Sequence, residues 1–228
     1  MPINVFGLEF NIFCKGGICM QISKNSRQMP KSTNITKAKN YSDVLYAWLQ
    51  CNSERVSAIS NNRRIHKTAV NYSAIERAFT KIDLEGNEIC AMRRRTIAKY
   101  FEGLLAMGLI EYSDVDGYYY LKVLDGESGH LIEYNTLLKL MNTLQKHAIS
   151  IYIYLFNRYY ACSCEPFIAT IAQIKDFVGI STTTTSNNEN VDDVLDILQR
   201  LGLLKFNLVI DESGKRYLQF MWVRNELP

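Results

Sequence analysis

One local pattern occurs twice along the chain and limits the folds that it can adopt. Each copy has an amphipathic helical stretch, a glycine, two aliphatic residues, a strand, an acidic turn with glycine, and a second strand. The helix–glycine junctions lie at residues 101–110 and 195–204. Gly108 and Gly202 can end their helices because glycine adopts the left-handed conformation at little cost. We therefore expect an α+β protein, mainly helical, with two modules of one kind in tandem.

Hydrophobic periodicity predicts where the helices lie. In the first copy we expect a helix capped by Ser42, with further helices over residues 73–81 and 92–107. In the second copy we expect helices over residues 135–144, 147–160, 168–177 and 191–201. The acidic turns at 114–117 and 211–214 predict hairpins that follow the glycine junctions. Residues 53–67, 83–87 and 179–190 are polar, and we expect a basic segment, a turn and a polar turn there.

The first forty residues differ from the rest. Residues 5–13 and 17–22 can form a short hairpin around Lys15-Gly16-Gly17. Residues 23–40 are polar and basic and contain Pro30, which favours a linker or arm. The predicted organisation is an N-terminal hairpin and basic arm over residues 1–40, a first module over 41–126 and a second over 130–228.

Charge is divided unequally along the chain, although the net charge is only +3. Residues 22–99 contain 15 Lys and Arg against 6 Asp and Glu, and residues 100–228 contain 10 against 16. A basic segment next to an acidic one indicates a localised face for a polyanion on the first module.

The two helix–glycine–hairpin junctions resemble those of winged-helix proteins. In that family the second helix of a helix-turn-helix meets DNA bases in the major groove. A tandem pair with additional N-terminal residues is similar to the replication initiators of bacterial plasmids and phages. This resemblance implies sequence-specific binding of double-stranded DNA, with one module reading a repeat and the other forming a dimer. A longer segment, residues 81–91, stands where the family has a short turn.

Candidate DNA contacts follow from this resemblance and from the charge. The recognition helix of the first module would present Arg93, Arg94, Arg95, Thr96 and Lys99, and the preceding basic segment would add Arg63, Arg64 and Lys67. In the second module the equivalent helix exposes Asp192, Asp193 and Asp196, which would repel phosphates. Only its wing offers a weaker pair, Lys215 and Arg216. We expect the acidic module to contact a second copy, as a homodimer, or a replication or transcription protein.

Several functions find no support in the sequence. It has no phosphate-binding loop, nucleophile elbow or H-E-x-x-H motif, so we predict no catalytic residue and no cofactor. Six cysteines with C-x4-C and C-x-C spacings, and three scattered histidines, favour reduced, mostly buried thiols over a zinc site. Without a leader-like start or a bilayer-length apolar run, we expect a cytoplasmic protein. The alternatives are a transcriptional repressor and a winged-helix interaction module that binds no DNA.

Overall fold

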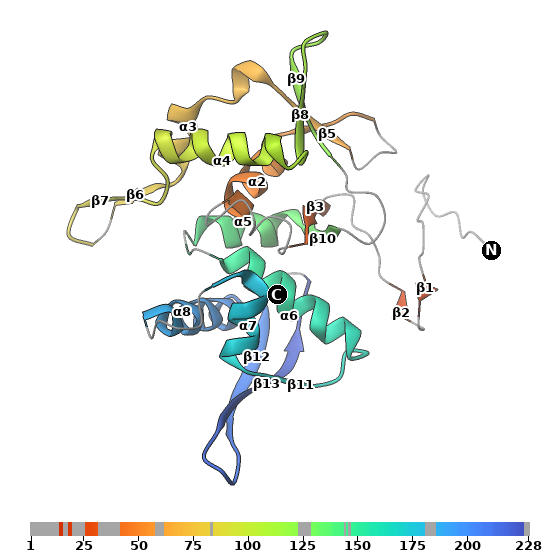
Figure 1. The fold of residues 1–228 in the computed structure, drawn as a ribbon, viewed down its shortest axis with the longest axis vertical. Coiled ribbons are helices and arrows are strands. Elements are labelled where there is room, and N and C mark those ends of the chain that lie inside the picture. Colours follow the sequence, from red (N-terminus) through yellow and green to blue (C-terminus); the bar gives the residue numbers. More distant parts are fainter. Residues whose placement is uncertain are drawn as a thin grey trace.

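The computed structural model describes residues 14–15, 18–19, 26–31, 42–57, 62–82, 84–122, 129–143, 145, 147–180 and 186–225, with the backbone alone for 14–15, 18–19, 129 and 186–190. Within these ranges the chain is α+β, with seven α-helices and several small antiparallel sheets (Figure 1). None of the helices in these ranges has the length and apolar composition needed to cross a bilayer.

The first unit spans residues 42–122. Its elements, in chain order, are α2 (Ser42–Cys51), β4 (Glu54–Arg55), β5 (Arg63–His66), the short 3-10 helix η1 (Lys67–Ala69), α3 (Tyr72–Ala78), β6 (Thr80–Ile82), β7 (Glu88–Cys90), α4 (Arg94–Ala106), β8 (Ile110–Ser113) and β9 (Tyr118–Leu121). Strands β4, β5, β9 and β8 form one antiparallel sheet in that order. Strands β6 and β7 form a separate hairpin between α3 and α4.

The second unit spans residues 148–223 and follows the same plan. It contains α6 (Ala148–Ala161), β11 (Phe167–Ala169), α7 (Ile171–Val178), α8 (Ser186–Arg200), β12 (Leu204–Ile210) and β13 (Arg216–Val223). Leaving aside β4, η1 and the β6–β7 hairpin of the first unit, each unit runs helix, strand, helix, helix and hairpin. In both sheets the early strand, β5 or β11, pairs with the last strand of the hairpin. The hairpins β8–β9 and β12–β13 point to opposite ends of the molecule (Figure 1).

A strand pair and a helix lie between the two units. Strand β3 (Ser26–Pro30) pairs with β10 (Gly129–Glu133), which leads into α5 (Tyr134–Asn142). The prediction of a linker over residues 23–40 is wrong for β3, because Met29 is fully buried and anchors this segment. Further upstream, β1 (Cys14–Lys15) pairs with β2 (Ile18–Cys19). Most of the hairpin predicted from residues 5–13 and 17–22 lies outside the described residues.

The first helices of the two units, α2 and α6, contact each other at the centre of the molecule (Figure 1). Residues 42–50 of α2 and 148–156 of α6 are all buried. Their apolar side chains belong to one hydrophobic core that continues through both units. A helix that is buried on every side must be surrounded by protein, and here each helix provides part of that cover for the other.

A polar contact joins these two helices inside the core. Ser150 donates a hydrogen bond of 2.6 Å to the Asp43 carboxyl, and the Val44 amide donates another of 2.8 Å. Asp43 is 2 % exposed. Burial raises the pKa of its carboxyl, although the hydrogen bond from Ser150 acts in the opposite direction. The neutral carboxylic acid is therefore favoured in the folded chain more than in the unfolded one.

The structure confirms the glycine junctions. Gly108 and Gly202 have φ values of +66° and +70°, which a residue with a side chain adopts only at a cost. In each unit the next leucine amide donates back into the last helical turn, from Leu109 to Leu104 and from Leu203 to Leu198, at 3.0 Å in both. The hairpins predicted after these junctions are β8–β9 and β12–β13.

Several local predictions are wrong. The helix predicted over residues 73–81 ends at Ala78, because residues 80–82 form β6. The helix predicted over residues 168–177 begins only at Ile171, because the preceding residues form β11 and Thr170 caps the helix with Gln173. Residues 186–190, predicted as part of a turn, form the start of α8. The polar segment 53–67 contains β4 and β5, and strands flank the turn at 83–87.

The buried carboxyl predicts how stability depends on pH. Because the folded-state pKa of Asp43 is raised above its unfolded value of about 3.9, its contribution is greatest below pH 4 and is lost as the pH rises through the folded pKa. Asp43→Asn, which cannot ionise, should lose less stability than the wild type between pH 4 and pH 8. Urea unfolding across this range measures the difference. Parallel stability curves for the two proteins would contradict a carboxyl held neutral by burial.

Candidate nucleic-acid interface

The start of α4 carries a group of cations. The backbone of Arg93 is extended, and its carbonyl accepts the amides of Thr96 and Ile97 at 2.8 and 2.9 Å, which begins the helix. Arg93 makes no side-chain capping bond, and the first turn contains no acidic residue. The positive end of the helix dipole and the arginine charges therefore coincide, which favours a negatively charged partner at this end.

One carboxylate of the same unit lies against this group. Arg94 Nε donates a hydrogen bond of 3.0 Å to one carboxylate oxygen of Glu76 on α3. Arg93 Nη1 lies 3.8 Å from the other oxygen of the same carboxylate. The two arginine side chains remain 65 % and 66 % exposed, whereas the Glu76 side chain is 18 % exposed. Such partly exposed ion pairs contribute about 0–1 kcal/mol each, so they orient the arginines without preventing contact with a phosphate.

Further cations follow on the outer face of α4. Arg95 and Lys99 are exposed one turn apart, and Thr96 is half-buried between them. Within the described residues neither Arg95 nor Lys99 makes an ion pair. Ile97, Phe101 and Leu104 are buried on the other side of the helix, as the periodicity predicted. The structure thus brings five of the predicted residues, Arg93, Arg94, Arg95, Thr96 and Lys99, to one surface, called the α4 basic face below.

Arg63 does not belong to an exposed surface, and its prediction as a DNA contact is wrong. Its side chain is buried in β5, where Nε donates to the Ser53 hydroxyl at 2.7 Å and Nη2 donates to the Ser53 carbonyl. Burial, followed by the nearby charges of Arg27 and Arg55, lowers the pKa of Arg63 to about 10. The guanidinium holds the turn after α2 against the sheet. The alternation of β5 places it inward, which the basic composition of this segment concealed.

Arg64 and Lys67 are more accessible, and both lie beside the first hairpin. Arg64 projects from the outer face of the sheet, where Nε pairs with Glu54 at 2.8 Å and the guanidinium lies 4.3 Å from the centre of the Tyr118 ring. Lys67 is exposed in η1, and its amide donates to the Gly117 carbonyl at 3.0 Å. Its backbone is thus fixed to the hairpin turn, while its side chain can reach a partner.

The second unit has the opposite charge on the equivalent helix. Asp192, Asp193 and Asp196 are exposed on α8, as predicted. Partial burial raises the pKa of Asp192, and the neighbouring Asp196 and Asp193 raise it further. Lys215 and Arg216 are exposed at the turn of the β12–β13 hairpin, at the end of the molecule opposite to β8–β9 (Figure 1). They cannot join the α4 basic face.

The described part of the chain contains no cluster of three His, Cys, Asp or Glu side chains arranged to hold a metal. Cys51, Cys90, Cys162 and Cys164 are thiols rather than disulfides. Sequence reasoning missed Glu76, because its pairing with Arg94, 18 residues away, depends on how α3 packs against α4.

Comparison with known proteins gives no relative for this chain. No protein-family model matches it, and neither a curated protein nor a solved structure shows significant similarity.

The buried position of Arg63 predicts a structural role. Arg63→Ala should lower the free energy of unfolding by roughly 1–3 kcal/mol, because the Ser53 groups lose their buried partner. Arg64→Ala, the matched control on the outer face of the same strand, should cost less stability than Arg63→Ala, because its ion pair with Glu54 is exposed to solvent. Urea denaturation of both variants measures this. Equal losses for the two would show that the two arginines are equivalent after all.

Proposed function

We propose that this protein binds double-stranded DNA through the α4 basic face. The observation that carries the proposal is the exposed group of Arg93, Arg94, Arg95 and Lys99 at the start of one helix, of which Arg93 and Arg94 pair with Glu76 and remain largely exposed. Arginine can bind guanine through two hydrogen bonds, and each neutralised phosphate adds salt-dependent affinity. The same region also has Lys67 beside the hairpin turn, from which it could reach the DNA backbone.

We further propose that each unit is a winged-helix module. The support is the order of elements in each unit, together with the pairing of an early strand with the last strand of the hairpin. In this assignment α3 and α4 form the helix-turn-helix of the first unit, with α4 as recognition helix and β8–β9 as wing. The hairpin β6–β7 replaces the usual short turn. It is exposed and lies directly before the α4 basic face in the chain.

For the biological role, we propose a plasmid or phage replication initiator. Two modules of one plan but opposite surface charge suit a protein in which one module reads DNA and the other meets a second copy or another protein. The acidic face of α8, formed by Asp192, Asp193 and Asp196, supports the second part. It equally favours the alternative of an interaction module.

A transcriptional repressor remains the alternative within DNA binding. Selection of binding sites from random duplexes separates the two, because an initiator should select directly repeated sites and a repressor a single palindrome.

The DNA-binding proposal predicts the effect of two substitutions on α4. Arg95→Ala/Lys99→Ala should weaken duplex binding about tenfold or more, because each lost contact contributes roughly 1–3 kcal/mol. It should also reduce the slope of log K against log salt by about two, one unit for each lost phosphate contact. Fluorescence anisotropy with a labelled duplex at several salt concentrations measures both quantities.

The matched control is Arg158→Ala, which removes an exposed cation near the end of α6 in the second unit. It should leave both the affinity and the salt slope close to the wild-type values. If the two variants lose the same affinity, binding depends on overall charge and not on α4. If neither loses affinity, the α4 basic face is not the DNA-binding surface.

A further inference from the structure

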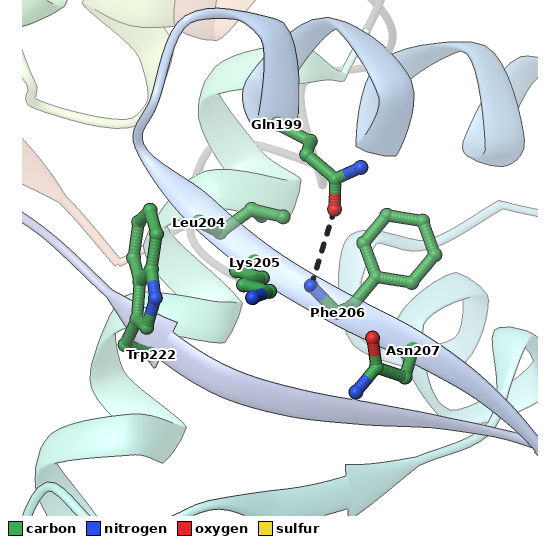
Figure 2. A pocket seen from close by; sticks show the side chains of 6 residues that line it. All are labelled: Gln199, Leu204, Lys205, Phe206, Asn207 and Trp222. Atoms are coloured by element: carbon green, nitrogen blue, oxygen red, sulfur yellow. Dashed lines mark hydrogen bonds between the residues drawn. The ribbon is translucent and has the colours of Figure 1, made fainter.

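A hollow of about 350 Å³ lies where α8 meets the edge strand β12 (Figure 2). It is lined by Gln199, Leu204, Lys205, Phe206, Asn207 and Trp222. Its volume is within the range of sites for small organic molecules. It lies outside the α4 basic face, and the proposed DNA binding makes no use of it.

The lining combines aromatic rings with a cation. Trp222 and Phe206 stand on either side of Lys205 (Figure 2), and Lys205 is the cross-strand partner of Trp222. Outside the hollow, the Arg224 guanidinium lies 4.5 Å from the centre of the Trp222 ring. Lys205 and Arg224 are exposed, and the Trp222 side chain is half-buried. One indole ring thus has a cation from each of two neighbouring segments.

The first unit has residues equivalent to Lys205 and Arg224, and their charges differ from those of the second unit. The Lys122 amide donates to the Leu109 carbonyl at 3.0 Å, just as the Arg224 amide donates to Leu203 at 2.8 Å. Lys122 is therefore the counterpart of Arg224. Similarly Glu111, which pairs across the strands with Tyr120, is the counterpart of Lys205.

In the first unit this position is neutralised internally. Lys122 Nζ and the Glu111 carboxylate form an ion pair of 2.9 Å. In the second unit the acid is replaced by Lys205, so two cations stand where the first unit has a cation and an anion. No carboxylate lines the hollow in the described part of the chain. An anionic ligand would supply the missing charge.

The amide groups of the hollow add hydrogen-bonding capacity. Gln199 Oε1 accepts the Phe206 amide at 3.2 Å, which fixes the orientation of the Gln199 side chain over the strand edge (Figure 2). Its Nε2 group retains donors for a ligand, and Asn207 offers both a donor and an acceptor. Such groups can bind the polar edge of a heterocyclic ring whose face stacks on an aromatic side chain.

We propose that this hollow binds a nucleotide unit. The base stacks on the half-buried Trp222 ring, and the phosphate is held by Lys205 and Arg224. The unit can come from a free nucleotide or from single-stranded DNA, since both present a base joined to a phosphate. This site is separate from the duplex-binding surface, so either proposal can fail while the other holds.

Tryptophan fluorescence of the full chain tests this proposal. The chain has two tryptophans, and Trp48 is 8 % exposed in the core, so a ligand in the hollow should quench chiefly Trp222. Adenosine monophosphate, adenosine, inorganic phosphate and a single-stranded oligonucleotide are titrated separately. We expect saturable quenching by adenosine monophosphate, by the oligonucleotide or by both, and binding about tenfold weaker with adenosine, which lacks the phosphate. Quenching by the oligonucleotide alone would identify a strand as the source.

The decisive variant is Lys205→Glu, which restores the acid–base arrangement of the first unit and is thus compatible with the fold. It should weaken binding about tenfold or more, because a favourable charge becomes a repulsive one. Lys122→Ala, the matched control at the first-unit position, should bind as the wild type does. Absence of saturable quenching by any nucleotide or oligonucleotide would overturn the proposal. So would Lys205→Glu binding as tightly as the wild type.

Discussion

The contact between α2 and α6, together with the packing of α5 against both helices, joins the two units. Each is the first helix of its unit, and each is buried on all sides over most of its length. Neither unit covers its first helix alone, because α5, which lies outside both units, packs against α2 and against α6. The two units therefore share one core, to which the Asp43–Ser150 hydrogen bond adds a directional contact. With these helices fixed, the hairpins point to opposite ends of the molecule, and the surfaces beside them are separated.

Much of this fold could be predicted from the sequence, for physical reasons that differ between elements. The helices α4 and α8 have strong periodicity, and Gly108 and Gly202 determine where they end, whereas α6 follows from a continuous apolar run. The hairpins follow from short apolar runs around acidic turns. By contrast β3, β5 and β11 are only three to five residues long, and their strand structure depends on partners far away in the chain. Local sequence carries little information about such pairing.

The candidate site was predicted in part for the same reasons. Helical spacing correctly separated Arg95 and Lys99 from the buried face of α4, since a regular helix fixes which side chains point outward. Composition alone grouped Arg63 with them, although an alternating strand turns neighbouring side chains to opposite faces. Charge counts along the chain therefore located the basic unit but not the exposed residues. The cations near Trp222 could not be predicted, because the register of β12 and β13 pairs Lys205 with Trp222 across the sheet.

Two units of one plan thus present different chemistry from equivalent helices, basic on α4 and acidic on α8. The most direct measurement of this difference is photo-crosslinking to duplex DNA from a photoreactive amino acid placed at position 99 or at position 196, the first on α4 and the second on α8. The account predicts crosslinks from position 99 that disappear with competing duplex, and none from position 196. Crosslinks from position 196 alone, or equal yields from both, would contradict it.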